Sequence, residues 1–169
     1  MDTFENLSFF RGVSAKYAVD RPQILTPRAD RRPKDSPKAF HKIADQWFER
    51  NFGIPYRSKG LFLTSQLVSA STYAATVDHV MRIIPLSDYR YCWSPKVKDL
   101  IFSAQRLATS SPQEIENHLD SLSYSETDLQ AAYDMGNEVM LYCENYIAIP
   151  ISLVTPPPEA KPQSIIITK

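Results

Sequence analysis

The chain has 169 residues, of which 43% are hydrophobic and 22% are charged, and this is the size and composition of one soluble globular domain. Lys and Arg number 19, as do Asp and Glu, so the net charge is zero, which excludes a uniformly basic nucleic-acid binder and a highly charged disordered tail. The charge is unevenly spread, however: residues 1–106 carry a net charge of +7 and residues 107–169 a net charge of −7, which indicates either a partner for each end or an intramolecular complement.

The cysteines and the N-terminus bear on the cellular compartment. Cys92 and Cys143 are the only two cysteines, and both lie in apolar, strand-like runs without a C-x-x-C motif, so we expect them to be buried small hydrophobic residues. The N-terminal residues lack the basic and apolar regions of a secretory signal. No apolar run approaches the ~20 residues of a membrane span. The sequence therefore predicts a cytoplasmic protein.

Hydrophobic periodicity and helix-breaking residues predict the elements in chain order. A strand at 7–13 is followed by an irregular, basic and Pro-rich connector at 22–37, a helix at 38–51, a strand at 60–65 and a helix at 67–77. Strands at 80–84 and 89–93 precede three helices, at 94–107, at 111–122 and from 125 onward. Strands at 138–142 and 146–154 come next, with a candidate final strand at 164–168.

The expected helix starts carry recognisable capping residues. Asp35 or Ser36 precedes the first helix, and Ser111 precedes the helix at 111–122. Ser125, with Asp128 three residues later, resembles a capping box. Apolar residues spaced three and four apart give the helix at 38–51 one inner face: Phe40, Ile43, Ala44, Trp47 and Phe48.

Strands and helices are mixed without a regular βαβ pattern, so we expect an α+β fold with mainly antiparallel strands. Only 4 residues are Gly, and the lack of G-x-G-x-x-G and G-x-x-x-x-G-K motifs argues against a Rossmann or P-loop nucleotide site. We expect one domain at 1–154 and a Pro-rich C-terminal tail at 155–169. His41, His79 and His118 share no metal-ligand spacing, so no metal site is expected.

Three short motifs stand apart as candidates for chemistry. The first is Phe9-Phe10-Arg11-Gly12-Val13. An arginine inside an apolar strand is costly unless it pairs or faces a cleft. The glycine beside it allows a backbone or a ligand to approach closely. The alternative is that Arg11 lies at a strand end in solvent.

The other two motifs lie at strand ends. The strand at 60–65 ends in Thr64-Ser65 and leads into a helix, so hydroxyl and N–H groups meet at a helix N-terminus, where small polar or anionic ligands bind; simple N-capping is the alternative. In Gly136-Asn137-Glu138, a carboxylate precedes an apolar strand. At a sheet rim it is either partly desolvated and fixed, as in an active site, or solvated.

The order of these motifs, strand Arg-Gly, then Thr-Ser, then Glu before a hydrophobic strand, resembles the mono-ADP-ribosyltransferase family of the Arg–Ser–Glu type, over residues 7–151. The segments Arg32-Pro33-x-Asp35-Ser36-Pro37 and Trp93-Ser94-Pro95 resemble a bacterial and phage-associated branch. The resemblance implies a split antiparallel β-sandwich with flanking helices. It also implies an enzyme that cleaves the nicotinamide–ribose bond of NAD and transfers ADP-ribose to a macromolecule, as a toxin or phage-conflict effector.

The resemblance also implies roles for individual residues. Glu138 would stabilise the positive charge that develops on the ribose, and Arg11 would hold the pyrophosphate with its guanidinium fork. Thr64 and Ser65 would orient Arg11, Glu138 or the nicotinamide amide. The remaining candidates for NAD binding are Gly12 beside Arg11, Tyr56 and Tyr73 as stacking rings, and Arg57 as a second phosphate ligand.

Two departures from the family pattern concern the acceptor and the serine motif. Leu63-Thr64-Ser65-Gln66 stands where the family has Ser-Thr-Ser, so either Thr64 or Ser65 fills the serine role. Gly136 stands two residues before Glu138, where members that modify arginine carry a second Glu. Arginine is therefore disfavoured as acceptor, and nucleic acid is favoured slightly over protein.

Two other functions remain open at this stage. One is a catalytically inactive binding module on the same fold, and the other is a nucleic-acid-binding regulatory protein that uses the +7 half. The basic run at 28–42 is either a solvated surface or a contact for the acceptor or the NAD phosphates. The acidic half and the Pro-rich tail offer contacts for an antitoxin or chaperone.

Overall fold

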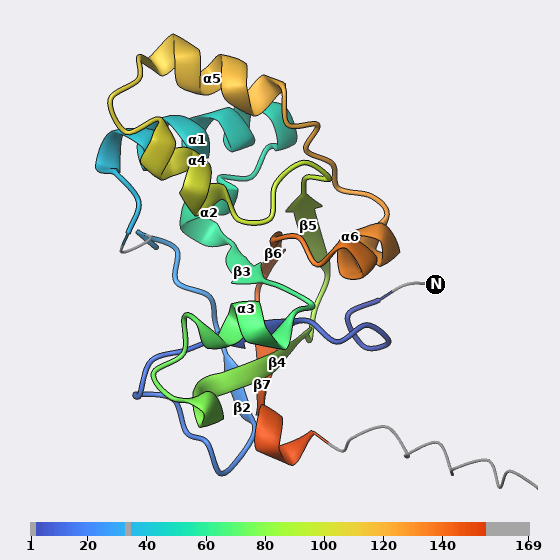
Figure 1. The fold of residues 1–169 in the computed structure, drawn as a ribbon. Helices are drawn as coiled ribbons and strands as arrows, with labels where there is room; N and C mark the ends of the chain where they lie inside the picture. Colours follow the sequence, from blue (N-terminus) through green and yellow to red (C-terminus); the bar gives the residue numbers. More distant parts are fainter. Residues whose placement is uncertain (1–2, 33–34, 155–169) are drawn as a thin grey trace, which may run out of the picture.

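Two antiparallel β-sheets form the centre of the protein (Figure 1). The structure is a computed structural model that describes residues 3–32 and 35–154. The first sheet has the strand order β1 (Phe10–Gly12), β4 (Val80–Pro85), β7 (Tyr146–Pro150) and β2 (Gln23–Leu25). The second has the order β3 (Leu61–Leu63), β6 (Val139–Cys143) and β5 (Tyr89–Trp93). This confirms the predicted α+β fold with antiparallel strands.

The two sheets are joined at two places. Phe10 N–H donates to the Thr64 carbonyl at 2.7 Å and Thr64 N–H donates back to Phe10 at 3.0 Å, which links the start of β1 to the end of β3. Elsewhere, Leu86 N–H donates to the Asn145 carbonyl at 2.9 Å. At that point both the β4–β5 and the β6–β7 connections pass from one sheet to the other. Side chains from neighbouring ends of both sheets can therefore reach a common space.

Helices cover the three-stranded sheet at one end of the molecule. Figure 1 shows α1 (Lys38–Phe52), α4 (Leu100–Arg106) and α5 (Pro112–Asp120) gathered there, with the short α2 (Tyr56–Lys59) between them and β3. Their apolar faces share one buried cluster with Cys92 and Met140. The expected inner face of α1 is confirmed, because Phe40, Ala44 and Phe48 are fully buried, Trp47 nearly so and Ile43 partly.

The remaining helices are short and lie beside the sheets. The α3 helix (Leu67–Ser71) packs on β1, and α6 (Leu129–Met135) adds Leu129 and Ala132 to the core between the sheets. Two 3₁₀ turns, η1 (Val77–His79) and η2 (Ile151–Leu153), complete the described chain.

Cys92 and Cys143 are both buried and free, as expected. Among the described helices, none has the length and apolar character needed to cross a membrane.

Several predicted boundaries differ from the observed ones. β2 and α2 were not expected, and the helix expected at 94–107 begins only at Leu100. The reason is local: Ser94 Oγ donates to the Leu122 carbonyl at 2.5 Å and accepts from Lys96 N–H at 3.1 Å, which holds this segment outside a helix. The helix expected at 67–77 ends at Ser71. The candidate strand at 164–168 and the Pro-rich tail lie outside the described residues.

The capping predictions were right for α5 and wrong for two other helices. Ser111 caps α5 and, with Glu114, forms a complete capping box. For α6 the cap is Asp128, which accepts from Ala131 N–H at 3.1 Å, rather than Ser125. For α1 the N-cap position is Pro37, without any side-chain cap, and Ser36 Oγ is buried without a hydrogen-bond partner.

Candidate functional site

A cavity of about 590 Å³ lies where β1, β3 and the start of β6 meet. The segment after α3 and the first turn of α4 form further walls, and Arg31 and Asp35 of the connector line it as well. Its volume is in the range of small-molecule and cofactor sites. Segments distant in sequence thus supply the walls of one partly open cavity.

Six of the eight candidate residues line this cavity: Arg11, Gly12, Arg57, Thr64, Tyr73 and Glu138. Tyr56 and Ser65 are not brought to it. Tyr56 is fully buried in the helical cluster, and its hydroxyl donates to Glu126 Oε1 at 2.6 Å. Ser65 Oγ donates to the Tyr133 carbonyl at 2.6 Å. Both side chains therefore have structural partners away from the cavity.

Gly12 is needed for close backbone packing at the cavity wall. A Cβ atom at this position would lie 2.6 Å from the Ala74 backbone nitrogen and 2.7 Å from the Tyr73 carbonyl carbon, and it would collide with the Ala70 carbonyl oxygen. The chain after α3 therefore lies directly against β1. Of the two approaches that the glycine allowed, the structure uses the one by the backbone.

Glu138 lies just before β6 with its side chain 11% exposed. Its N–H donates to the Lys98 carbonyl at 2.8 Å, and its carboxylate accepts from the N–H of Leu100. Arg57 Nη1 donates to Glu138 Oε1 at 3.2 Å. Burial raises the pKa of Glu138 to about 7, against the opposing effects of Arg57 and of the Leu100 N–H. The carboxylate is thus fixed, desolvated and poised to change its protonation near neutral pH.

Arg57, on α2, lines the cavity beside Glu138 and holds its carboxylate. Its side chain is only 2% exposed, and its Nε atom is buried without a hydrogen-bond partner. Its guanidinium carbon lies 4.2 Å from the centroid of the Phe62 ring. The guanidinium carbon of Arg31 lies 4.0 Å from the same centroid, and Arg31 Nη1 donates to the Gly60 carbonyl at 3.2 Å. Phe62 thus supports two cationic side chains at the cavity.

The cavity has more positive than negative charge available for a ligand. Among the described residues, neither Arg11 nor Arg31 is in an ion pair, whereas Arg57 is paired with Glu138. Burial lowers the pKa of Arg31, and the positive charges of Arg11 and Arg57 lower it further. An anionic group would relieve this repulsion, and the planar guanidinium fork matches the oxygens of a phosphate.

The hydroxyls of the Thr-Ser segment do not orient Arg11 or Glu138. Thr64 Oγ1 accepts from Gln66 N–H at 3.0 Å and donates to the Gly136 carbonyl at 3.5 Å. Thr64 thus holds the N–H of Gln66, the N-cap residue of α3, in a local turn, and α3 has no side-chain cap, so the simple capping alternative is not realised either. The group that contacts the Glu138 carboxylate is instead Arg57.

Aromatic rings border the side of the cavity formed by α3 and α4. Tyr73 is 56% exposed, and its hydroxyl donates to Asp99, which in turn accepts from Ile101 N–H at 2.9 Å. Phe102, on α4, is 66% exposed. Exposed rings of this kind offer faces for a flat heteroaromatic group. Tyr73 was expected in this role, whereas Phe102 was not.

The sequence reasoning missed several of the lining residues, among them Phe62, Asp99 and Phe102. Arg31 was covered only as part of the basic run at 28–42, for which a contact with the NAD phosphates was one alternative. One signal was present: Phe62 lies between the buried Leu61 and Leu63, so strand alternation turns its ring to the opposite face. Asp99 and Phe102 gave no such signal, because the start of α4 was placed too early.

Within the described residues, no group of three His, Cys, Asp or Glu side chains is arranged to hold a metal ion.

Comparison with known proteins gave no match: neither a family model, nor a curated protein, nor a solved structure corresponds to this chain. The function must therefore be argued from the residues of the cavity themselves.

Proposed function

We propose that the protein is an NAD-dependent ADP-ribosyltransferase that cleaves the nicotinamide–ribose bond and transfers ADP-ribose to a macromolecular acceptor. The observation that carries this proposal is the shared cavity of Arg11 and Glu138. These two residues come from distant parts of the chain, and they supply the cation and the carboxylate that the reaction requires.

NAD binding is supported by the charge of the cavity. The pyrophosphate carries two negative charges, and Arg11 and Arg31 are the cavity arginines without an ion pair among the described residues. Hydrogen bonds between charged partners are shorter and stronger than neutral ones, and a guanidinium makes two at once. Tyr73 and Phe102 offer ring faces for the adenine or the nicotinamide.

The chemistry follows from the position of Glu138. When the bond from the ribose C1′ to the nicotinamide nitrogen breaks, its electron pair leaves with nicotinamide, which becomes neutral. The ribose then carries positive charge, as in glycoside cleavage. The ionised carboxylate of Glu138 stabilises that charge and accepts a hydrogen bond from a ribose hydroxyl. The acceptor then forms the new bond to C1′ and releases its proton to solvent.

Burial strengthens this effect of Glu138. An ionised carboxylate in a desolvated place interacts more strongly with a nearby positive charge than it would in water. Arg57 keeps the carboxylate in one orientation at 3.2 Å, so little reorganisation is needed when the ribose charge appears. Arg57 thus acts as a positioning residue.

The two joined antiparallel sheets with helices at their sides agree with the split β-sandwich of the ADP-ribosyltransferase resemblance. On the same resemblance we infer a toxin or phage-conflict effector, with an antitoxin or chaperone as a natural partner. The acceptor is a nucleic acid or a protein, with nucleic acid favoured slightly. Gly136 supports this preference because its φ of +66° strains any other residue, and the Gln66 Cγ atom, 2.6 Å from where a Cβ atom would be, would have to move for an acidic side chain.

The proposal is tested by incubating the purified protein with NAD labelled in its ADP-ribose part, together with cell extract. We expect free nicotinamide and labelled macromolecules, and the label should be removed by nuclease if the acceptor is nucleic acid and by protease if it is protein. NAD that binds without release of nicotinamide would contradict the enzymatic function and support an inactive binding module.

A further inference from the structure

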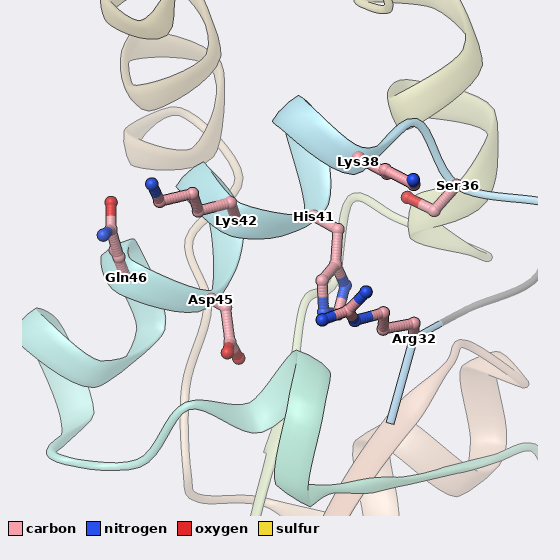
Figure 2. Close-up of a pocket in the computed structure, with 7 residues that line it drawn as sticks. All are labelled: Arg32, Ser36, Lys38, His41, Lys42, Asp45 and Gln46. Carbon is pink, nitrogen blue, oxygen red and sulfur yellow. The ribbon is translucent and has the colours of Figure 1, made fainter. Parts of the chain in front are cut away.

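A second cavity, of about 630 Å³, adjoins the connector. The connector also lines the first cavity, the proposed NAD site, which is called the NAD cavity below. Figure 2 shows the side chains around it, which come from the first turns of α1 and from the connector. Arg31 and Asp35 face the NAD cavity, whereas Arg32 and Ser36, each the next residue along, line the second one. We call this second cavity the basic groove.

The charge of the basic groove is strongly positive. Arg32, Lys38 and Lys42 line it, and none of them forms an ion pair among the described residues. The one carboxylate in its lining, Asp45, is already engaged, because it accepts from the N–H of Ser58 on α2 at 3.0 Å. The groove therefore keeps a net positive charge, with three cations against one carboxylate.

The groove also contains hydrogen-bonding groups that have no partner within the described residues. The N-terminus of α1 has neither a side-chain cap nor an acidic residue in its first turn. Two buried polar atoms of the groove lining, Ser36 Oγ and His41 Nδ1, have no hydrogen-bond partner. Buried polar atoms are normally hydrogen-bonded, so these two are available to a ligand in the groove. In Figure 2 Lys38 extends toward Ser36, and His41 and Arg32 extend toward one another.

The ligand must carry negative charge and accept hydrogen bonds from these groups. A helix N-terminus with lysines and an arginine suits phosphate oxygens. Burial lowers the pKa of His41, and the positive charges of Arg57, Arg32 and Arg31 lower it further against the opposing effect of Asp45, which favours the neutral imidazole with one N–H. Three cations spread along one groove fit the successive phosphates of a nucleic-acid strand better than they fit one isolated phosphate group.

We propose that the basic groove binds the phosphate backbone of a single-stranded nucleic acid, the acceptor of the ADP-ribose. The role of the strand as acceptor rests on the proposed function, whereas the binding of the strand in the groove does not. Since adjacent residues of the connector line the two cavities, a strand in the groove leads directly to the mouth of the NAD cavity. A base inside a duplex cannot reach such a cavity, so the strand must be single or locally opened.

Binding is tested without NAD, by adding a short single-stranded oligonucleotide to protein labelled at its histidines. We expect the NMR signal of His41 to shift and those of His79 and His118 to stay. Replacing two cations, in Arg32→Gln/Lys38→Gln, should weaken binding at least tenfold and reduce the salt slope by about 1.4, the value for two lost phosphate contacts on a single strand.

The matched control is Lys16→Gln/Arg21→Gln, which removes the same charge from exposed residues that line neither cavity. We expect less than a twofold change in its affinity. Equal weakening of the two double variants would overturn the proposal, because it would show a general charge effect. An oligonucleotide that binds without shifting the His41 signal would also overturn it.

Activity separates this inference from the proposed function. In Arg32→Gln/Lys38→Gln, transfer to the oligonucleotide should fall at least tenfold more than the release of nicotinamide without acceptor. Equal loss of both activities would show that the groove shapes the NAD cavity and would overturn its role in the acceptor. If the wild-type protein does not cleave NAD but its His41 signal responds as expected, the proposed function fails and the nucleic-acid site stands. Transfer only to protein, with no oligonucleotide binding, would overturn the inference.

Discussion

At the scale of single residues, the pair of Arg57 and Glu138 determines what the cavity can do. Both side chains are almost entirely buried, and their ion pair at 3.2 Å balances two charges that would each be costly alone. Burial nevertheless raises the pKa of Glu138 to about 7, so desolvation outweighs the attraction of Arg57. The carboxylate is therefore only partly ionised at neutral pH, and NAD turnover should depend on its ionisation.

We expect kcat/KM for NAD cleavage to rise about tenfold per pH unit below pH 7 and to level off above about pH 8, because the ionised Glu138 is the active form. In Arg57→Gln the midpoint of this rise should move to higher pH, since the charge that lowers the pKa of Glu138 is gone. Nicotinamide release measured from pH 5 to 9 gives both profiles. A flat profile for the wild-type protein, or an unmoved midpoint in the variant, would contradict this role of the pair.

Arg11 allows a test that is independent of Glu138. In Arg11→Lys an ammonium replaces the guanidinium fork, so we expect NAD affinity to fall about 10-fold or more, the order of one charged hydrogen bond. The melting temperature should hardly change, because the Arg11 side chain forms no ion pair within the described part of the chain. Calorimetry of NAD binding, with Lys16→Gln as a control, measures this. Unchanged affinity would exclude Arg11 from phosphate binding.

At the scale of elements, the sequence was most informative where periodicity is strong. The inner face of α1, the capping box of α5 and the strands β4 and β5 were predicted within one or two residues. The three-residue β2 and the four-residue α2 are too short to show a period, and tertiary contacts determine them.

The site was also predictable only in part, because tertiary contacts decide which side chains reach the cavity. Arg11 and Glu138 were visible because each is a charged residue in an apolar strand context. The sequence could not show that Ser65 and Tyr56 have partners elsewhere, at Tyr133 and Glu126, because these contacts depend on the fold. Nor could it show that Arg31, from a segment without regular structure, stacks on Phe62.

The packing of α3 on β1 predicts the effect of Gly12→Ala. The added methyl group would collide with the backbone of Ala70 and Ala74, so we expect a loss of about 1–3 kcal/mol of stability and weaker NAD binding as the Tyr73 wall moves. Gly53→Ala is the matched control: its φ of +76° makes the substitution strained, but nothing lies within 4 Å of the added atom. Denaturant unfolding and NAD titration of both variants separate the two effects. If Gly12→Ala bound NAD as wild type, the wall would not depend on this contact.

At the scale of the whole molecule, the two oppositely charged halves meet within the chain. Among the described residues there are five ion pairs, and three of them connect the basic first half to the acidic second half: Arg50–Glu116, Arg57–Glu138 and Arg90–Glu126. The other two join residues close in sequence. The intramolecular complement is therefore present in part, while Arg32, Lys38 and Lys42 of the basic groove form no ion pair among the described residues and stay available to a partner.

These links differ in their expected contribution to stability. Glu126 accepts a hydrogen bond from the hydroxyl of the buried Tyr56 and also pairs with Arg90, so Glu126→Ala should cost about 1–3 kcal/mol by leaving that hydroxyl without a partner. Glu116→Ala removes only the outer pair with Arg50 and should cost at most about 1 kcal/mol. Denaturant unfolding measures both, and equal costs would contradict this ranking. NAD turnover per folded molecule should be unchanged in both variants.

The central claim is that the buried carboxylate of Glu138 cleaves NAD by stabilising charge on the ribose. The most direct measurement is the rate of nicotinamide release by Glu138→Gln, with Glu144→Gln as the matched control because Glu144 is exposed and lines neither cavity. Both variants should fold and change NAD affinity little, although Glu138→Gln should be less stable because the buried Arg57 loses its counter-charge. We predict a fall in kcat of about 10²-fold or more for Glu138→Gln, the order expected for one electrostatic stabiliser, and less than a twofold change for Glu144→Gln. Near-wild-type turnover by a folded Glu138→Gln protein would contradict the account.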